Sequence, residues 1–319
     1  MEWLITLGVL VGALALFTLI LTLFFFAFAV RRNDKYTVEA ALSRMEKKTP
    51  PDQFTRVKQG AESFLNAPHK EVFITSRDGL KLCACLMEQE DPASARGTIV
   101  LAHGWRSHPA FDFSASWSYY LKKGLNVLAI HQRAHGKSEG KYICFGVKER
   151  FDLIDWVKFA NERYGDDKKV IVSGISMGAS TVLMALGEDD LPANVVAATA
   201  DCGFVSAWDE FSHVLHHSYH LPKFPLLYTT DLLSRAVADF PFRGYSTEES
   251  LQKARIPILI IHGLADTFVP PEHSRRSAAA CAAPYELIEI EGAGHGLSYL
   301  VDPQTVSAKL DAFIDNALF

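Results

Sequence analysis

Apolar runs of strand length recur through the chain and alternate with stretches of helical pattern. These runs occupy residues 98–104, 126–132, 169–175, 195–201, 256–263 and 285–292. Most of the intervening stretches repeat apolar residues at helical spacing. Nearly continuous apolar strands separated by helices are typical of a parallel sheet that is covered on both faces. The sequence therefore predicts an α/β fold with a mostly parallel, doubly wound sheet.

The N-terminal segment has no charged residue from Trp3 to Val30. A helix of this length would span about 42 Å, more than the roughly 30 Å hydrocarbon core of a bilayer. A cleaved signal peptide is the alternative, because Ala27 and Ala29 resemble a small-x-small cleavage site. The run is longer than a signal peptide's apolar region, and no Lys or Arg precedes it. We therefore expect one transmembrane helix within residues 1–32.

Charge and cysteine usage bear on the compartment. Arg31, Arg32 and Lys35 follow the apolar segment, whereas Glu2 precedes it. The positive-inside rule therefore predicts that the bulk of the chain lies in the cytoplasm behind a single-pass membrane anchor. Five scattered cysteines favour buried, reduced thiols, which agrees with that side of the membrane. The net charge of −5 gives no basic surface, so nucleic acid is not an expected partner.

The remainder of the chain divides into a linker and one large domain. Residues 33–70 are polar and mostly helical in pattern, with apolar residues at helical spacing that predict a linker packed on the domain. Residues 71–319 carry the strand runs and begin with a hairpin signal at Asp78-Gly79. The segment 204–253 is rich in aromatic residues and interrupts the strand–helix alternation, so we expect it to form a helical lid.

The stretch GISMGAS, residues 174–180, carries Ser176 between Gly174 and Gly178. A β-branched run precedes it and a helical pattern follows it. Strand, sharp turn and helix are the context of a nucleophile elbow, in which flanking side chains would collide with the turn. The motif is short enough to occur by chance, so its interpretation depends on suitable partners elsewhere.

Two partners follow later strands. Asp266 comes after the run 256–263, and His295 comes after the run 285–292. The carboxyl ends of parallel strands meet at one edge of a sheet, and the order Ser, Asp, His is the one expected of this architecture. We therefore predict that Ser176, Asp266 and His295 form a catalytic triad. Asp201 is an alternative acid, which we interpret as a structural hydrogen-bonding residue near the site.

Several further motifs accompany the triad residues. They are ITSRDGLKL, LAHGW, HQRAHGKSEG, ADCGF, IHGLADTFVP and GAGHG. With these motifs, roughly residues 54–319 resemble the α/β-hydrolase superfamily, in particular bacterial membrane-anchored hydrolases of the serine aminopeptidase-like and prolyl-oligopeptidase-like group. The chain departs from the family pattern at His131 and Ala134, where relatives often carry Asp and Gly. We interpret this segment as structural, with Arg133 and Ser138 fixing the loop.

The resemblance implies a mechanism and an oxyanion hole. His295 would accept the proton of Ser176, and Asp266 would orient the imidazole. The backbone N–H of Met177 follows the nucleophile directly and is one expected oxyanion donor. In the resembling family the other donor follows the His-Gly pair at the end of a strand, which points to Trp105 here. His103 is interpreted as structural. No cofactor and no metal are expected.

The lid contains His213, His216, His217 and His220, spaced three and four residues apart. Histidines one helical turn apart can bind zinc. Without a Glu within the run or a Cys nearby, we favour an amphipathic helix that carries imidazoles on its surface. The lid aromatics are expected to pack on the domain and to line an apolar acyl pocket.

These inferences favour a membrane-anchored serine hydrolase that cleaves an ester, a thioester or a related acyl bond. Its expected partners are a small-molecule or lipid-like acyl substrate and the membrane itself. The alternative is an aminopeptidase-like serine peptidase, in which Asp209, Glu210 or Asp231 would bind the substrate's amine. Less favoured alternatives are an acyltransferase, which shares the chemistry up to deacylation, and a scaffold that has lost catalysis.

Overall fold

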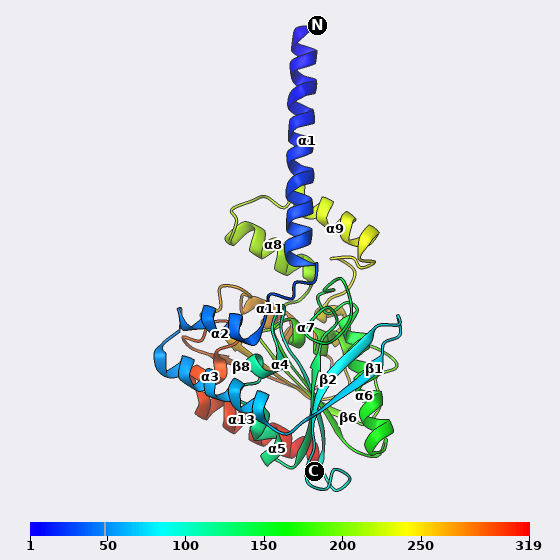
Figure 1. Ribbon diagram of the computed structural model, residues 1–319, viewed down its shortest axis with the longest axis vertical. Coiled ribbons are helices and arrows are strands. Elements are labelled where there is room, and N and C mark those ends of the chain that lie inside the picture. The colour runs from blue at the N-terminus through cyan, green and yellow to red at the C-terminus, as the bar shows by residue number, and fades with distance from the viewer. Residues whose placement is uncertain (48) are drawn as a thin grey trace.

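A central sheet forms the body of the molecule in this computed structural model, which describes residues 1–47 and 49–319 (Figure 1). The strands lie within three residues of the predicted runs, and a hairpin precedes them. Their bounds are β1 Lys70–Thr75, β2 Lys81–Met87, β3 Gly97–Ala102, β4 Leu125–His131, β5 Val170–Ile175, β6 Val195–Asp201, β7 Ile258–Gly263 and β8 Tyr285–Ile290.

The strand order is β1-β2-β4-β3-β5-β6-β7-β8. Strand β2 pairs antiparallel with both β1 and β4, and the pairs from β4 to β8 are parallel. From β3 the chain continues to β4 on one side, and from β4 it passes over β3 to β5 on the other side. The direction in which strands are added therefore reverses at β3. Open α/β sheets bind ligands beyond the carboxyl ends of strands at such a point. The sheet confirms the predicted α/β fold, and its reversal point predicts a binding site at the loops after β3 and β5.

Helices cover the sheet, and a long N-terminal helix projects from it (Figure 1). The helix bounds are α1 Glu2–Ala29, α2 Val38–Glu46, α3 Pro51–Asn66, α4 Pro109–Asp112, α5 Trp117–Lys122, α6 Glu149–Tyr164, α7 Met177–Ala185, α8 Ala207–His217, α9 Leu226–Val237, α10 Thr247–Leu251, α11 Glu272–Ala279, α12 Ser298–Val301 and α13 Pro303–Leu318.

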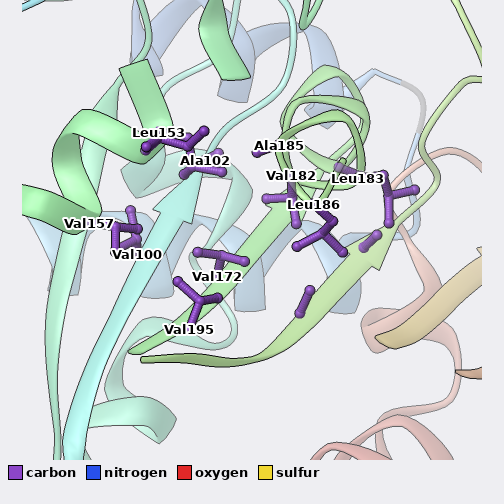
Figure 2. Packing of buried hydrophobic residues seen from close by; sticks show 14 of the residues in the cluster. Val100, Ala102, Leu153, Val157, Val172, Val182, Leu183, Ala185, Leu186 and Val195 are labelled. Carbon is purple, nitrogen blue, oxygen red and sulfur yellow. The ribbon is translucent and has the colours of Figure 1, made fainter. Parts of the chain in front are cut away.

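Alternate residues of each buried strand face two separate cores. On β3, Val100 and Ala102 pack in a cluster with α6 and α7, as Figure 2 shows, whereas Ile99 and Leu101 pack with α3, α5 and α13. Burial of one such aliphatic side chain contributes roughly 1.5–3 kcal/mol. A sheet with apolar residues on both faces is therefore held rigidly, and it fixes the positions of its carboxyl-end loops.

Helix α3 of the linker and the loop after β4 both contact the rest of the domain. Helix α3 buries Val57, Ala61 and Phe64 against the domain. The Arg133 guanidinium lies 2.6 Å from Asp152 and 2.7 Å from Asp78. Ser138 Oγ donates to the backbone oxygen of residue 131 and accepts from the N–H of residue 83. These contacts fix the loop, as expected of a structural segment.

The lid region contains α8, α9 and α10, and α8 and α9 lie beside the lower end of α1 (Figure 1). Helix α8 ends at His217, so His220 lies beyond it and the four histidines do not share one continuous helix. The reason is the turn at residues 218–220, where His220 adopts a positive φ of 54°. His213 bonds the Thr267 carbonyl oxygen at 3.0 Å, which ties the lid to the loop after β7.

Candidate active site

Ser176 occupies a strained turn between β5 and α7. Its backbone has φ 56° and ψ −120°, a region that non-glycine residues rarely adopt. A Cβ on Gly178 would collide with the carbonyl oxygen of Ala102, and one on Gly174 would collide with the Gly178 backbone. The steric reason for both flanking glycines is thus present, and the turn projects the serine beyond the sheet edge.

The structure brings the three residues of the predicted triad together, with His295 hydrogen bonded to both Ser176 and Asp266. His295 Nε2 is 2.9 Å from Ser176 Oγ, and His295 Nδ1 is 2.7 Å from Asp266 Oδ2. Each residue stands on a different loop at the carboxyl edge of the sheet. This arrangement has the geometry in which an imidazole can accept a serine proton while a carboxylate stabilises the resulting charge.

Asp266 is buried and heavily hydrogen bonded. Burial alone would raise the pKa of its carboxyl, but hydrogen bonds from His262 and His295 and from the Val269 N–H outweigh burial and lower that pKa. Its Oδ1 also accepts the Phe268 N–H at 2.9 Å. The carboxyl is therefore ionised at neutral pH, as a residue that stabilises an imidazolium must be.

Asp201 ends β6 next to the nucleophile but contacts it through the backbone. Its carbonyl oxygen accepts the Ser176 N–H at 2.8 Å, and its carboxyl accepts a 3.4 Å hydrogen bond from Ser298. Burial raises the pKa of the Asp201 carboxyl to about 6. Its contacts match the structural interpretation, because the imidazole nitrogens of His295 already bond Asp266 and Ser176.

The two expected oxyanion donors flank the nucleophile. Met177 is the first residue of α7, so helix geometry leaves its N–H without an intrahelical acceptor. Trp105 lies between two residues whose N–H groups are used elsewhere: Gly104 donates to Asp112 at 2.6 Å, and Arg106 donates to His135 at 2.9 Å. Of this three-residue stretch, the Trp105 N–H is therefore the available one.

Asp112 belongs to the site although no sequence pattern indicated it. Its second carboxyl oxygen accepts a 2.6 Å hydrogen bond from Ser107, so the side chain bridges the ends of the turn after β3. Burial raises the pKa of Asp112 against the lowering effect of these bonds. The side chain holds Gly104 in place, and a Cβ on Gly104 would lie 3.2 Å from that of Ser176. A single Asp in a loop carries no signal of this role.

Two cavities border Ser176. The first, of about 200 Å³, is almost entirely apolar, and we call it the lid cavity. Its walls include Leu215 and Leu226 of the lid and also Phe25 and Phe28 of α1. The second, of about 810 Å³, is more polar and borders Asp112, Asp201 and His295. The nucleophile therefore has an apolar compartment for one part of a ligand and a polar one for another.

One buried carboxyl lines the lid cavity. Glu210 on α8 is 4% exposed, and among the described residues neither of its carboxyl oxygens has a hydrogen-bond partner. Burial raises its pKa well above the ordinary value, and the nearby charges of Asp266 and Asp209 raise it further. Asp209 instead bonds Arg276 at 2.9 Å, and Asp231 bonds Arg235 at 2.8 Å.

Cys202 brings a thiol close to the triad. Donor atoms of Cys202, Asp266 and His295 lie within 4.8 Å of one another, a spacing that a metal ion could bridge. Burial raises the pKa of the Cys202 thiol well above its usual value, which disfavours the thiolate that metals prefer. Both imidazole nitrogens of His295 already have partners, so the triad geometry accounts for this cluster.

Comparison with known proteins gives consistent similarities. The sequence profile of the alpha/beta hydrolase family matches residues 99–309. Protein YqkD of Bacillus subtilis is 27% identical over 225 residues, which cover 70% of this chain and 73% of the relative. The alpha/beta hydrolase domain-containing protein 17B of Xenopus laevis is 26% identical over 239 residues, or 70% and 69% of the two chains.

A solved structure is similar over an even larger share. An esterase from Pyrococcus furiosus superposes with a TM-score of 0.64 at 25% sequence identity. The similarity covers 81% of this chain and 95% of the esterase.

Proposed function

This chain belongs to the alpha/beta hydrolase family, and from that premise we propose that it is a serine hydrolase acting on an ester, a thioester or a related acyl bond. The observation that carries the proposal is the continuous hydrogen-bond chain from Ser176 through His295 to Asp266. The similarity to an esterase structure supports the same class of reaction.

In the proposed reaction, Ser176 Oγ attacks the acyl carbon as His295 Nε2 takes its proton. The N–H groups of Met177 and Trp105 stabilise the oxyanion of the tetrahedral intermediate. His295 then protonates the leaving group, and an acyl-enzyme remains on Ser176. Water, deprotonated by His295, attacks this ester, and collapse of the second intermediate releases the acid and restores the serine.

The preferred substrates in this proposal carry a lipophilic acyl chain, and the enzyme is a single-pass membrane protein with its catalytic domain in the cytoplasm. The apolar lid cavity next to Ser176 supports the first part. Helix α1 is long and apolar enough to cross a membrane, with a mean hydropathy of 2.7 in its most apolar stretch. The basic residues that follow α1 favour the cytoplasmic orientation.

Labelling with a fluorophosphonate probe tests the nucleophile. Full-length protein in detergent micelles should be labelled, whereas Ser176→Ala should not, with circular dichroism to verify that both are folded. A panel of p-nitrophenyl esters from butyrate to palmitate then tests the acyl preference. Labelling that persists in Ser176→Ala would disprove the assigned nucleophile. A preference for short, water-soluble esters would disprove the lipophilic substrate.

Glu210 favours a second candidate, a peptidase that binds the free amine of its substrate. Of the three acidic residues considered for that task, Asp209 and Asp231 form ion pairs, whereas Glu210 faces the lid cavity without a hydrogen-bond partner among the described residues. An ammonium group bound there would supply donors to both carboxyl oxygens and favour their ionised form.

Aminoacyl p-nitroanilides with free and acetylated amines distinguish the two candidates. The peptidase candidate requires faster cleavage of the free-amine compounds and loss of that preference in Glu210→Gln. Asp209→Asn serves as the matched control, because Asp209 precedes Glu210 directly and its carboxylate is bound to Arg276. Equal and negligible cleavage of both compounds, with ester hydrolysis intact, would eliminate the peptidase.

A further inference from the structure

Helix α1 divides into two parts with different surroundings. Every residue from Glu2 to Ile20 except Thr18 is exposed. These roughly 19 residues would extend about 28 Å, which matches the roughly 30 Å hydrocarbon core of a bilayer. The excess length that the sequence shows therefore corresponds to the last turns of the helix, residues 21–29, which pack on the protein.

Those last turns are fixed to the lid and to the catalytic loops. Thr22 Oγ1 lies 2.6 Å from Thr229 Oγ1 of α9, and the Phe25 ring meets that of Tyr219 edge to face at 4.9 Å. The Trp105 indole N–H donates to the Ala29 carbonyl oxygen at 2.8 Å. The position of the exposed part of α1 relative to the lid is therefore set by direct contacts.

The lid also exposes large apolar side chains near this junction. Phe224 and Leu232 are 72% and 68% exposed, and three further large side chains between residues 219 and 237 are more than one-third exposed. We call the group the lid face, and it consists of Tyr219, Phe224, Tyr228, Leu232 and Val237. The Phe224 and Tyr228 rings lie 5.8 Å apart, and Leu232 follows Tyr228 by one turn of α9, so these exposed side chains adjoin one another as at an interaction surface.

We propose that the lid face lies in the bilayer, and that an acyl chain passes from the bilayer into the lid cavity alongside the last turns of α1. The expected partner is lipid, because α9 packs on α1 just below residues 2–20. A membrane around residues 2–20 would therefore border the lid. Phe25, Phe28 and Ala29 line the cavity that reaches Ser176. The same helix would thus cross the membrane and form a wall of the acyl pocket.

The membrane contact can be tested without any enzymatic activity. Full-length protein with Cys281→Ser and Leu232→Cys is labelled with an environment-sensitive fluorophore and reconstituted in phosphatidylcholine vesicles. Phe73→Cys, on β1 of the body and 43% exposed, is the matched control. Lipids with brominated acyl chains should quench the label at residue 232 but not at residue 73, and aqueous iodide should quench only residue 73.

Two outcomes would overturn the proposal. Iodide quenching at residue 232 equal to that at residue 73 would mean that the lid face lies in water. Protection from both quenchers, together with cross-linking between chains, would mean that a second copy covers it. Neither outcome depends on hydrolysis, so failure here differs from failure of the proposed function, which would abolish probe labelling at Ser176.

The entry route rests on the proposed function and has its own assay. Phe224→Ser with Leu232→Ser should reduce hydrolysis of a long-chain ester embedded in vesicles by about tenfold or more, the equivalent of one buried apolar side chain. Hydrolysis of a short, soluble ester should not change, because neither residue lines the lid cavity. Equal loss on both substrates, or loss on neither, would contradict entry from the bilayer.

Discussion

The proposed triad and the lid cavity meet at Ser176 but are built in opposite ways. The proposed triad residues follow β5, β7 and β8 of the central sheet, and the side-chain polar atoms of these three residues are hydrogen bonded. The lid cavity is lined largely by apolar side chains from α8, α9 and α1, and α1 is far from the two lid helices in sequence. If the proposed function holds, the hydrogen-bonded triad determines the reaction and the lid cavity selects the substrate.

This separation has a physical basis. A triad needs hydrogen-bond geometry within a few tenths of an ångström, which a rigid sheet edge provides. An apolar cavity needs only shape and the exclusion of water, so helices that pack side by side suffice. Substitutions on the catalytic side should therefore reduce rates for every substrate, whereas those on the lid side should change relative rates.

The largest expected effect is that of Asp266→Asn. Loss of the carboxylate that orients His295 should lower kcat by about 10⁴ for both short and long acyl esters. The ratio of the two rates should stay within a factor of two or so. A change in chain-length preference as large as the change in rate would show that the two parts of the site are not separate.

An intermediate effect is expected of Phe25→Ala on α1. Loss of this ring from the cavity wall should reduce kcat/KM for a long-chain ester by about 10- to 100-fold and leave a short-chain ester unaffected. Phe24→Ala is the matched control, because Phe24 is the adjacent residue and is 54% exposed. Equal effects of the two substitutions would show that the helix acts only as an anchor.

A smaller effect is expected of Trp105→Phe. This change removes the indole donor to the Ala29 carbonyl oxygen and keeps the backbone N–H of residue 105. One such hydrogen bond contributes about 1 kcal/mol, so kcat/KM for long chains should fall roughly fivefold. Steady-state kinetics on the ester panel measures it, and a general loss of kcat would instead indicate damage to the oxyanion hole.

No effect on rate or chain-length preference is expected of Glu88→Gln, because Glu88 follows β2 beside the amino end of β4, at the sheet edge opposite the proposed triad. Burial alone would raise the pKa of Glu88, but bonds from Arg163, Lys70 and Tyr164 lower it to about 2. A lowered carboxyl pKa stabilises the fold above about pH 4.5, and this contribution is lost as the pH falls toward 2.

The stability of that variant should therefore depend on pH. At pH 7 the free energy of unfolding should fall by about 1 kcal/mol, and the difference from wild type should shrink below pH 4.5. Thermal unfolding of the full chain in detergent between pH 7 and pH 3 measures this. Exposed Glu90→Gln is the control, and a difference that grows at low pH would contradict the assigned pKa.

The strands and the elements that carry the triad were predictable because each leaves a local pattern. Each strand is visible as an apolar run, and Ser176 is visible by its two flanking glycines. Asp266 and His295 each follow such a run directly. A side chain at either glycine would collide with Ala102 or with the turn itself, so the glycine pattern has a steric cause.

The lid side was predictable only in outline. The sequence predicts aromatic residues in a lid, but the part of Phe25 and Phe28 in the cavity depends on packing between segments that no local pattern connects. In the sequence, Glu210 looks like an ordinary polar residue of an amphipathic helix. The lack of a hydrogen-bond partner for its carboxyl, among the described residues, appears only when α8 is placed over Ser176. The end of α8 at His217 likewise depends on a turn with no strong breaker in its sequence.

The contact between Thr22 and Thr229 has a consequence for biosynthesis. These residues are 207 positions apart, so α1 leaves the ribosome long before α9 is made. Because N-terminal segments emerge first, α1 has no contact with α9 through most of translation. A newly made chain would thus have no complete lid cavity until α9 is made and reaches α1, so the proposed preference for lipophilic acyl chains would arise late in synthesis.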